Sequence, residues 1–366
     1  MNLMDHDEDL EHLLAAAQDP DVLVRNTIAG DSTIPLCVQQ VLVTDTDMSV
    51  RLHLARNPSA DSSILESLAT DDSDEVLYAV AAHCDAPKHI LYDMADSEDF
   101  RLRNAIASNV NCPVDVLCLL AKDAIPIVRG RVALHKSTPR AILGHFCEDT
   151  SLAVRQSLAR NHSLPSELID QLVLFAEQDC AVYLSQHPNV AIEHLVRWAD
   201  EPDCLVRQAV SQHPSTPVEV LDQLGDDHDV FVQNSVLDNP NVSEDTLSRM
   251  AESDFSGIRS KVCGHRNAPL NLVLDMASND PDEDVRQAAC IGMMQIGDDV
   301  YRGAIADEVI SLSMPFGPGR QTLGDHLLDA GHTDFYQRLQ SIELELRVAA
   351  SGAALPSVQK KNSFRM

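Results

Sequence analysis

The amino-acid sequence predicts an all-α protein, an α-solenoid in which two-helix repeats of about 26 residues stack in a row. A short phrase returns along the chain as VRLHLARNPS at 50–59, VRQSLARNHS at 154–163 and VRQAVSQHPS at 206–215. Three residue positions recur at the same interval of 26 residues over most of the chain. Hydrophobic residues make up 44% of the chain and aromatic residues only 4%, as expected for short helices packed through aliphatic side chains.

An arginine recurs every 26 residues, and the position is lost at Leu77, Ala181 and Gln233. The members of this arginine register are Arg25, Arg51, Arg103, Arg129, Arg155, Arg207, Arg259 and, after an interval longer by one residue, Arg286. Asn or His follows six residues later, as Asn57, His83, Asn109, His135, Asn161, His187, His213, Asn239 and His265. Proline keeps a third register, as Pro35, Pro87, Pro113, Pro139, Pro165, Pro217 and Pro269. A fixed interval of this length is the signature of a repeat architecture.

A first helix is predicted around the arginine of each repeat. Its apolar positions are Val50, Leu54 and Ala55 in one copy and Val154, Leu158 and Ala159 in another. This spacing puts them on one helix face. We expect the Asn/His position to end the helix, because asparagine tolerates a left-handed backbone there.

A second helix is predicted after the proline. Its apolar positions are Ile64, Leu65, Leu68 and Ala69 in one copy and Ile142, Leu143, Phe146 and Cys147 in another. The proline is expected in the first helical turn, where its missing N–H costs nothing, with Thr138 and Thr216 as N-caps. Two such short helices cannot bury their apolar faces alone, whereas stacked copies can, so we expect a solenoid.

The repeats divide the chain into four predicted parts. Residues 1–18 form an N-terminal capping half-repeat, because Leu13, Ala16 and Ala17 are in register with the second helices. Residues 19–290 hold about ten repeats, and 291–350 form a C-terminal helical cap or, alternatively, a separate partner-binding piece. Residues 351–366 are expected to be a disordered tail.

The repeat phrases VRLHLARNPSADSSILESLATD and VRQAVSQHPSTPVEVLDQLGDD resemble the leucine-rich repeat variant family over residues 19–290. The resemblance implies a right-handed superhelix that alternates α-helices with short 3₁₀ helices. A HEAT-like array is the neighbouring possibility. One family member carries an iron–sulfur cluster on an N-terminal cysteine group, but only Cys37 falls in the first 80 residues here, so the cluster is not carried over.

Charge and cysteine content indicate what kind of protein this is. With 27 basic and 57 acidic residues the net charge is −30, which argues against nucleic acid as the default ligand and suits a partner with a basic surface, or solubility alone. The nine cysteines are scattered and form no CxxC pair, which predicts free, mostly buried thiols. The acidic N-terminus and the absence of a long apolar run predict a soluble, cytoplasmic protein.

No residue is assigned to catalysis, to a cofactor or to a metal. The register histidines His83, His135, His187, His213 and His265 are expected to close turns, since asparagine replaces them freely. The register arginines could bind anions but are expected to pair with the acids of neighbouring repeats, namely Asp45, Asp71, Asp123 and Asp149.

Other conspicuous residues are also given structural roles. Trp198 shares its register with Leu68, Leu120 and Leu172 and is expected in the core. Asp325–His326 and Asp329…His332 lack a neighbouring nucleophile pattern, and GPGR at 317–320 lacks the residues of a phosphate loop, so it is expected to be a turn.

The predicted function is a non-catalytic scaffold, of adaptor, inhibitor or immunity type, that holds a protein partner with a basic surface. The sequence does not predict which residues contact the partner or what the oligomeric state is. A nucleic-acid-binding or DNA-repair solenoid is the first alternative and needs a basic face. An iron–sulfur or other metal-binding redox protein is the second.

Overall fold

The computed structural model describes residues 3–317 and 321–351, and every regular element in those ranges is an α-helix, which confirms the predicted all-α fold. Among the described residues, the only β-type backbone pairing is an isolated antiparallel bridge between Pro315 and Thr322. The chain forms two compact units, Met1–Ala191 and Ile192–Met366.

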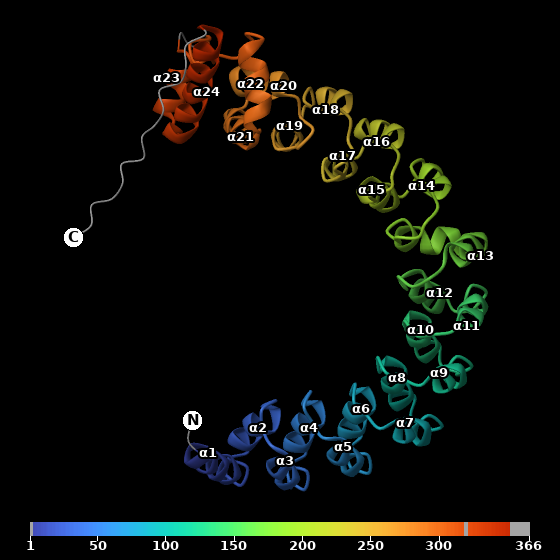
Figure 1. The fold of residues 1–366 in the computed structure, drawn as a ribbon. Helices are drawn as coiled ribbons and strands as arrows, with labels where there is room; N and C mark the ends of the chain where they lie inside the picture. The colour runs from blue at the N-terminus through green and yellow to red at the C-terminus, as the bar shows by residue number, and fades with distance from the viewer. Residues whose placement is uncertain (1–2, 318–320, 352–366) are drawn as a thin grey trace. The chain divides into compact units, whose positions relative to one another are not determined.

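In the first unit the two helices of each repeat lie in two layers (Figure 1). The first layer holds α2 (Val22–Gly30), α4 (Met48–Arg56), α6 (Asp74–Ala82), α8 (Phe100–Ser108), α10 (Pro126–Leu134) and α12 (Leu152–Ala159). The second layer holds α3 (Leu36–Leu42), α5 (Ser62–Leu68), α7 (Lys88–Met94), α9 (Val114–Leu120), α11 (Arg140–Phe146) and the longer α13 (Ser166–Leu184). Helix α1 (Leu3–Ala16) packs on α2 and α3.

The second unit continues the same alternation. Its first layer holds α15 (Cys204–Gln212), α17 (Val230–Val236), α19 (Ser256–Cys263) and α21 (Glu283–Gln295). Its second layer holds α14 (Ile192–Trp198), α16 (Val218–Gly225), α18 (Glu244–Met250) and α20 (Leu270–Asn279). The unit ends with α22 (Asp298–Ala306), α23 (Leu323–Asp329) and α24 (Thr333–Ser351), and α24 packs on both of the others.

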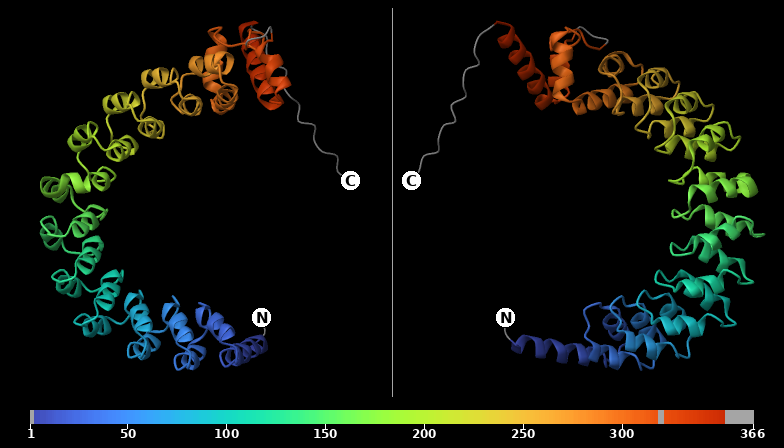
Figure 2. Two further views of the ribbon diagram at one scale, coloured as in Figure 1. Left: turned by 180° about the vertical axis from the view of Figure 1, so that it is seen from behind. Right: turned by 45° about the vertical axis from the view of Figure 1, so that its right-hand side comes forward.

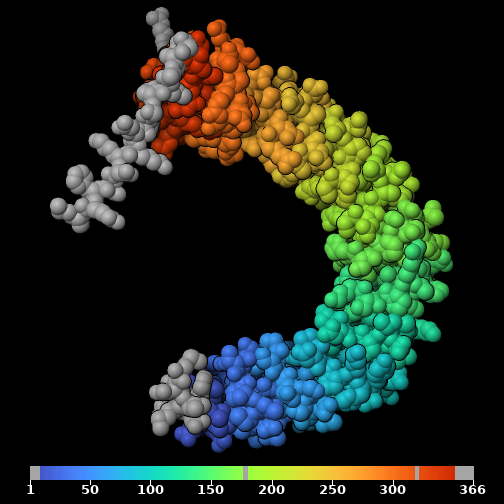
Figure 3. All heavy atoms as spheres, in the orientation of Figure 1, coloured from blue at the N-terminus to red at the C-terminus, as the bar shows by residue number. Residues whose placement is uncertain are grey.

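Each repeat packs mainly on the repeats next to it in sequence. Within a unit, each first-layer helix contacts the next first-layer helix, and the two further views show the same alternation of layers (Figure 2). The colours of the space-filling view follow one another in sequence order along each unit (Figure 3). This nearest-neighbour packing is the defining property of a solenoid.

The predicted apolar stripes form the core between the layers. Val50, Leu54 and Ala55 of α4 are fully buried, and so are the equivalent residues of α12. In the second layer Leu65 and Leu117 are fully buried as well. The spacing of apolar residues in the sequence therefore identified the buried face of both helices.

The second-layer helices are α-helical and not 3₁₀, contrary to what the family resemblance implied. In α5 the N–H of Leu65 donates to the carbonyl of Asp61 at 3.0 Å, and the N–H of Ala69 donates to Leu65 at 3.0 Å. These are i→i−4 bonds. Seven residues complete nearly two turns, enough for the α-helical bonds that have the better geometry.

Three predictions about helix ends are wrong. The residues that end the first helices have ordinary extended backbone, with φ −68° at Asn57 and −71° at Asn109, because their side chains bond outside the helix. The prolines stand at the N-cap position, before the first turn, as at Pro139 and Pro217. Thr138 and Thr216 are not N-caps: each buried hydroxyl donates back to a carbonyl of the preceding first helix.

Helix α13 joins what the repeat predicts as two helices. The loop between repeats elsewhere begins with an acidic residue such as Asp149, whose carboxylate accepts the N–H of Ser151 at 2.8 Å and so forms a turn. Phe175 stands at that position here and has no such acceptor, so the helix continues from Ser166 to Leu184.

The last 60 residues or so form shorter helices than expected. Within the expected helical cap, α22 ends at Ala306, and the chain turns at Glu308 with φ 58°. Gly331 at φ 79° separates α23 from α24. Of the expected GPGR turn at 317–320, only Gly317 belongs to the described residues. Of the expected tail at 351–366, only Ser351 does, so its basic residues Lys360, Lys361 and Arg365 lie outside the described residues. None of the described helices combines the length and apolar character needed to cross a bilayer.

Candidate functional site

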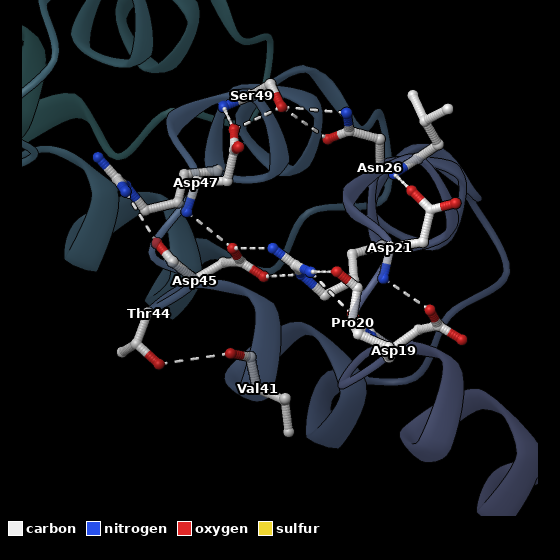
Figure 4. A network of polar contacts seen from close by, with 12 residues as sticks. Asp19, Pro20, Asp21, Asn26, Val41, Thr44, Asp45, Asp47 and Ser49 are labelled. Carbon is white, nitrogen blue, oxygen red and sulfur yellow. Dashed lines mark hydrogen bonds and ion pairs between the residues drawn. The ribbon is translucent and has the colours of Figure 1, made fainter.

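The register arginines form a ladder of ion pairs between neighbouring repeats. In the first pair, Nε and Nη2 of Arg25 donate to the two oxygens of Asp45 at 2.6 and 3.0 Å, and Nη1 donates to the carbonyl of Asp19 at 2.8 Å (Figure 4). The described pairs of this geometry are Arg25–Asp45, Arg51–Asp71, Arg103–Asp123, Arg129–Asp149, Arg207–Asp227 and Arg259–Asp280. The predicted ion pairing is thereby confirmed.

The aspartates of this ladder stay ionised. At Asp149 burial alone would raise the carboxyl pKa, but the hydrogen bonds from Arg129 and from the Ser151 N–H outweigh it and leave the pKa lowered. At Asp280 the hydrogen bond from Arg259 is the largest effect and lowers the pKa. Each arginine charge is thus neutralised by a carboxylate, so the paired arginines do not form a positive stripe for anions.

In two of the repeats that lack the register arginine, the aspartate that would pair with it in the next repeat is also absent. Leu77 has Ser97 opposite, and Gln233 has Ser253. Gln233 still donates its amide to the carbonyl of Asp227 at 2.7 Å, which reproduces the main-chain bond of the arginine. A half-buried carboxylate without its arginine would be costly, which accounts for the joint loss.

The Asn/His position forms a second ladder through the interior. Asn109 donates from Nδ2 to the carbonyls of Ala81 and His83 in the preceding repeat, at 2.9 and 2.7 Å. His135 then places Nε2 at 2.8 Å from the carbonyl of Asn109. On their other side both residues accept the N–H two positions later, from Asn111 and Ser137.

This geometry leaves the ladder histidines no free nitrogen for a metal. The ligand atoms of His83, Cys84 and Asp85 lie within 4.8 Å of one another. However, Nε2 of His83 faces the carbonyl of Asn57 at 2.9 Å, and Nδ1 accepts the N–H of Asp85 at 3.0 Å. Nε2 must therefore carry the proton and Nδ1 already uses its lone pair, so this histidine cannot act as a ligand while the ladder is intact.

The first layer has a face that points away from the core, which we call the exposed face, and no motif in the sequence marks it. It consists of the residues two before, one after, two after and five after the arginine position, because these lie opposite the buried stripe. Gly130, Ala209 and Ser235 are exceptions, because they are buried although they stand at these positions. Large apolar side chains stand there uncovered: Leu23 is 68% exposed, Ile127 53%, Leu205 55% and Phe231 69%. The helical period could have located this face, but exposure required the structure.

Charge is distributed unevenly around the exposed face. From α2 to the end of α12 the face carries Arg56, Arg101, Arg131 and Arg160, and Glu75 is its only acidic side chain. The loops that lead into the first-layer helices are instead rich in acids, and we call them the acidic edge. In the first unit the acidic edge comprises Asp19, Asp21, Asp45, Asp47, Asp71, Asp72, Asp96, Glu98, Asp99, Asp123, Glu148 and Asp149, together with Asp74 at the first residue of α6.

Part of the acidic edge is structural. Asp47 caps α4 by accepting the N–H of Ser49 at 2.8 Å, and Asp21 and Asp99 cap α2 and α8 in the same way. Negative charge at a helix N-terminus is favourable. Other carboxylates are exposed to solvent, such as Glu98, and Asp72, whose side chain is 91% exposed although it accepts a hydrogen bond from Nη2 of Arg51 at 2.7 Å.

The remaining conspicuous residues have structural contacts. Trp198 is fully buried, as expected. Asp325 forms a capping box with Thr322 at the start of α23. His326 lies 3.7 Å from the thiol of Cys290, but burial raises the pKa of Cys290 and lowers that of His326, so a reactive thiolate is not favoured.

The nine cysteines form no disulfide among the described residues, and Cys112, Cys147, Cys180, Cys263 and Cys290 are buried. Cys37 and Cys84 are exposed, whereas Cys118 and Cys204 are intermediate. Burial of the majority agrees with their use as small apolar residues.

Several solved structures resemble this chain. A leucine-rich repeat variant with a novel repetitive structural motif matches with a TM-score of 0.45 and 18% identity, over 61% of this chain and 88% of its own. An engineered protein matches with a TM-score of 0.26 and 16% identity, over 80% and 98%. A computationally designed armadillo repeat protein for modular peptide recognition matches with a TM-score of 0.16 and 13% identity, over 79% and 100%. No family model and no curated protein matches the chain.

Proposed function

We propose that this protein is a non-catalytic scaffold that holds a protein partner on the exposed face of its first layer. The observation that carries the proposal is the recurrence of large uncovered apolar side chains at one position of that face, as at Leu205 and Phe231. Exposed apolar groups bordered by charged ones have the composition of a protein interface. An adaptor, inhibitor or immunity-type role fits such a surface.

The acidic edge supports a partner with a basic surface. It borders the exposed face along the starts of the first-layer helices, and the whole chain has a net charge of −30. Solvent-exposed carboxylates such as Glu98 attract a basic partner over about 10 Å at moderate ionic strength. Binding should therefore weaken as salt is added.

The test compares two surface variants in the second unit. Phe231→Ser removes an aromatic side chain from the exposed face, whereas Val196→Ser changes an exposed apolar residue on α14 in the second layer. Proteins captured from the source cell are quantified by mass spectrometry with each variant. The proposal predicts that Phe231→Ser loses the partner and Val196→Ser keeps it. Equal capture of the same partner by both variants would contradict it.

Nucleic-acid binding is the second candidate, favoured by the four arginines Arg56, Arg101, Arg131 and Arg160 on the exposed face of the first unit. The bordering acidic edge repels phosphates and makes this candidate the weaker one. Fluorescence anisotropy with single-stranded and double-stranded DNA and with RNA decides it. Binding that is lost when all four arginines are changed to glutamine would replace the protein-scaffold proposal.

A further inference from the structure

The end of the repeat array forms a cavity of about 560 Å³ in the second unit, which is open to solvent on the side of Glu283 and Ile291. Its walls come from α21, through Arg286, Cys290 and Ile291, and from the segment that follows α22, through Phe316, His326 and His332. The ring of Phe316 lies 4.9 Å from that of His326. A cavity of this size, part apolar and part polar, suits a small organic ligand or a few residues of a peptide.

Arg286 is the last member of the arginine register, and it lacks the aspartate that the six paired arginines of the register have. Its Nη1 donates to the carbonyl of Asp280 at 2.7 Å, just as Nη1 of Arg259 donates to Ser253 at 2.8 Å. Nε and Nη2 of Arg259 then bind Asp280, whereas no ion pair is formed by Arg286 within residues 3–317 and 321–351. The reason is that the array ends here, so no further repeat supplies the aspartate.

We infer that this cavity binds a ligand carboxylate, which takes the place on Arg286 that an aspartate takes on the paired arginines. The paired arginines show which ligand suits this guanidinium. As in Arg259, Nη1 donates to a main-chain carbonyl, and Nε and Nη2 donate to the two oxygens of one carboxylate. Phe316 and Ile291 would then contact an apolar body. This inference is independent of the proposed function, because it concerns a cavity and not the exposed face.

The surroundings restrict the ligand to one carboxylate on an apolar body. Glu283 also lines the cavity and would repel a second negative charge. Cys290 on α21 and His326 on the opposite wall also line the cavity, and burial raises the pKa of the thiol and lowers that of the imidazole, which favours their uncharged forms. Two sources share this chemistry: a free aryl or alkyl carboxylic acid, and the C-terminal carboxylate of a peptide that ends in an apolar residue.

Calorimetric titration of the full chain tests the inference with matched probes. 3-Phenylpropionate and the peptide acetyl-Gly-Gly-Phe represent the two sources, and their carboxamides serve as uncharged controls. We expect at least one acid to bind and its amide to bind about tenfold more weakly or worse, as for the loss of a charge-assisted hydrogen-bonded pair. Which acid binds identifies the source. No binding by either acid, or equal binding by acid and amide, would overturn the inference.

Arg286→Gln is the matched variant, because Gln233 shows that glutamine retains the main-chain bond at this register. It should weaken binding about tenfold or more, whereas Arg302→Gln on α22, outside the cavity, should leave binding unchanged. Circular dichroism checks folding. If Arg286→Gln does not fold, Ile291→Trp is measured instead. This variant places a larger side chain in the cavity from an exposed position and should weaken binding of the acid as well. Unchanged affinity in the folded variant that is used would overturn the inference.

Discussion

Asparagine and histidine replace each other at one buried position of the repeat because both side chains are planar with an acceptor and a donor at fixed places. At Asn109 the oxygen accepts the N–H of Asn111 and the amide reaches the previous repeat. At His135 the two ring nitrogens do the same. The position thus requires one hydrogen-bonding shape and not one residue type, and the bond across repeats satisfies carbonyls that would otherwise be buried without a partner.

Changes at His135 test this ladder. His135→Asn should leave the free energy of unfolding nearly unchanged, because asparagine makes both bonds elsewhere in the chain. His135→Ala should lower it by about 1–3 kcal/mol, since the carbonyl of Asn109 and the N–H of Ser137 lose their partner. Urea unfolding of the two variants measures the difference. Equal stability of the asparagine and alanine variants would refute the ladder.

The ion pair Arg129–Asp149 allows a second test based on the chain's own exceptions. Changing Arg129 alone to Gln, or Asp149 alone to Ser, leaves one half-buried charge unpaired and should cost up to about 3–5 kcal/mol. The double variant copies the natural combination of Gln233 and Ser253 and should recover much of that loss. A double-mutant cycle by urea unfolding measures the coupling energy. If the two losses simply add, the pair is not coupled.

At the scale of a helix, the second layer depends on aliphatic residues that are buried between neighbouring repeats. Leu117 of α9 is fully buried and stands at the position of Leu65 in α5. Leu117→Ala should create a cavity and lower the free energy of unfolding by about 2–5 kcal/mol. Leu119→Ala on the same helix is the control, because Leu119 is 46% exposed and its loss should cost far less. Similar denaturant midpoints for the two variants would show that the assigned register is wrong.

Helix length follows from whether the local sequence supplies a turn. Helix α13 runs through a repeat boundary because Phe175 replaces the aspartate that forms the turn elsewhere. Helix α21 runs on to Gln295 because Gly292 stands where Asn or His ends the other first helices. A Cβ at Gly292 would lie 2.2 Å from the carbonyl oxygen of Cys263, so the glycine also permits the close approach of α21 to α19.

At the scale of the whole molecule, the repeated ion pairs make stability sensitive to acid. The register arginines lower the pKa of the carboxyls they bind; burial alone would raise it, as at Asp123 and Asp227. A carboxyl with a lower pKa in the folded state adds stability that is complete above its unfolded value of about 3.9 and is lost as the pH falls through the folded value. We therefore expect the free energy of unfolding to fall steeply below about pH 4.

Acid unfolding followed by circular dichroism measures this effect. The double variant of Arg129 and Asp149 lacks one pair and should lose less stability between pH 5 and pH 3 than the natural chain. The difference should correspond to the proton uptake of one carboxyl, since the remaining pairs are unaffected. An identical pH dependence in both proteins would show that the pair does not contribute.

The repeated sequence by itself determined the period, the buried stripe of each helix and the pairing of arginines with aspartates such as Asp45 and Asp149. These features depend on helical periodicity and on a phase shared by neighbouring copies, both of which are visible along the chain. Only the tertiary structure decided that Asn57 and His83 bond across repeats, that Phe231 stays uncovered and that Arg286 lines a cavity instead of pairing with an aspartate of a further repeat. The physical reason is that partners, exposure and empty space depend on which surfaces of distant segments meet, and the local spacing of residues does not specify this.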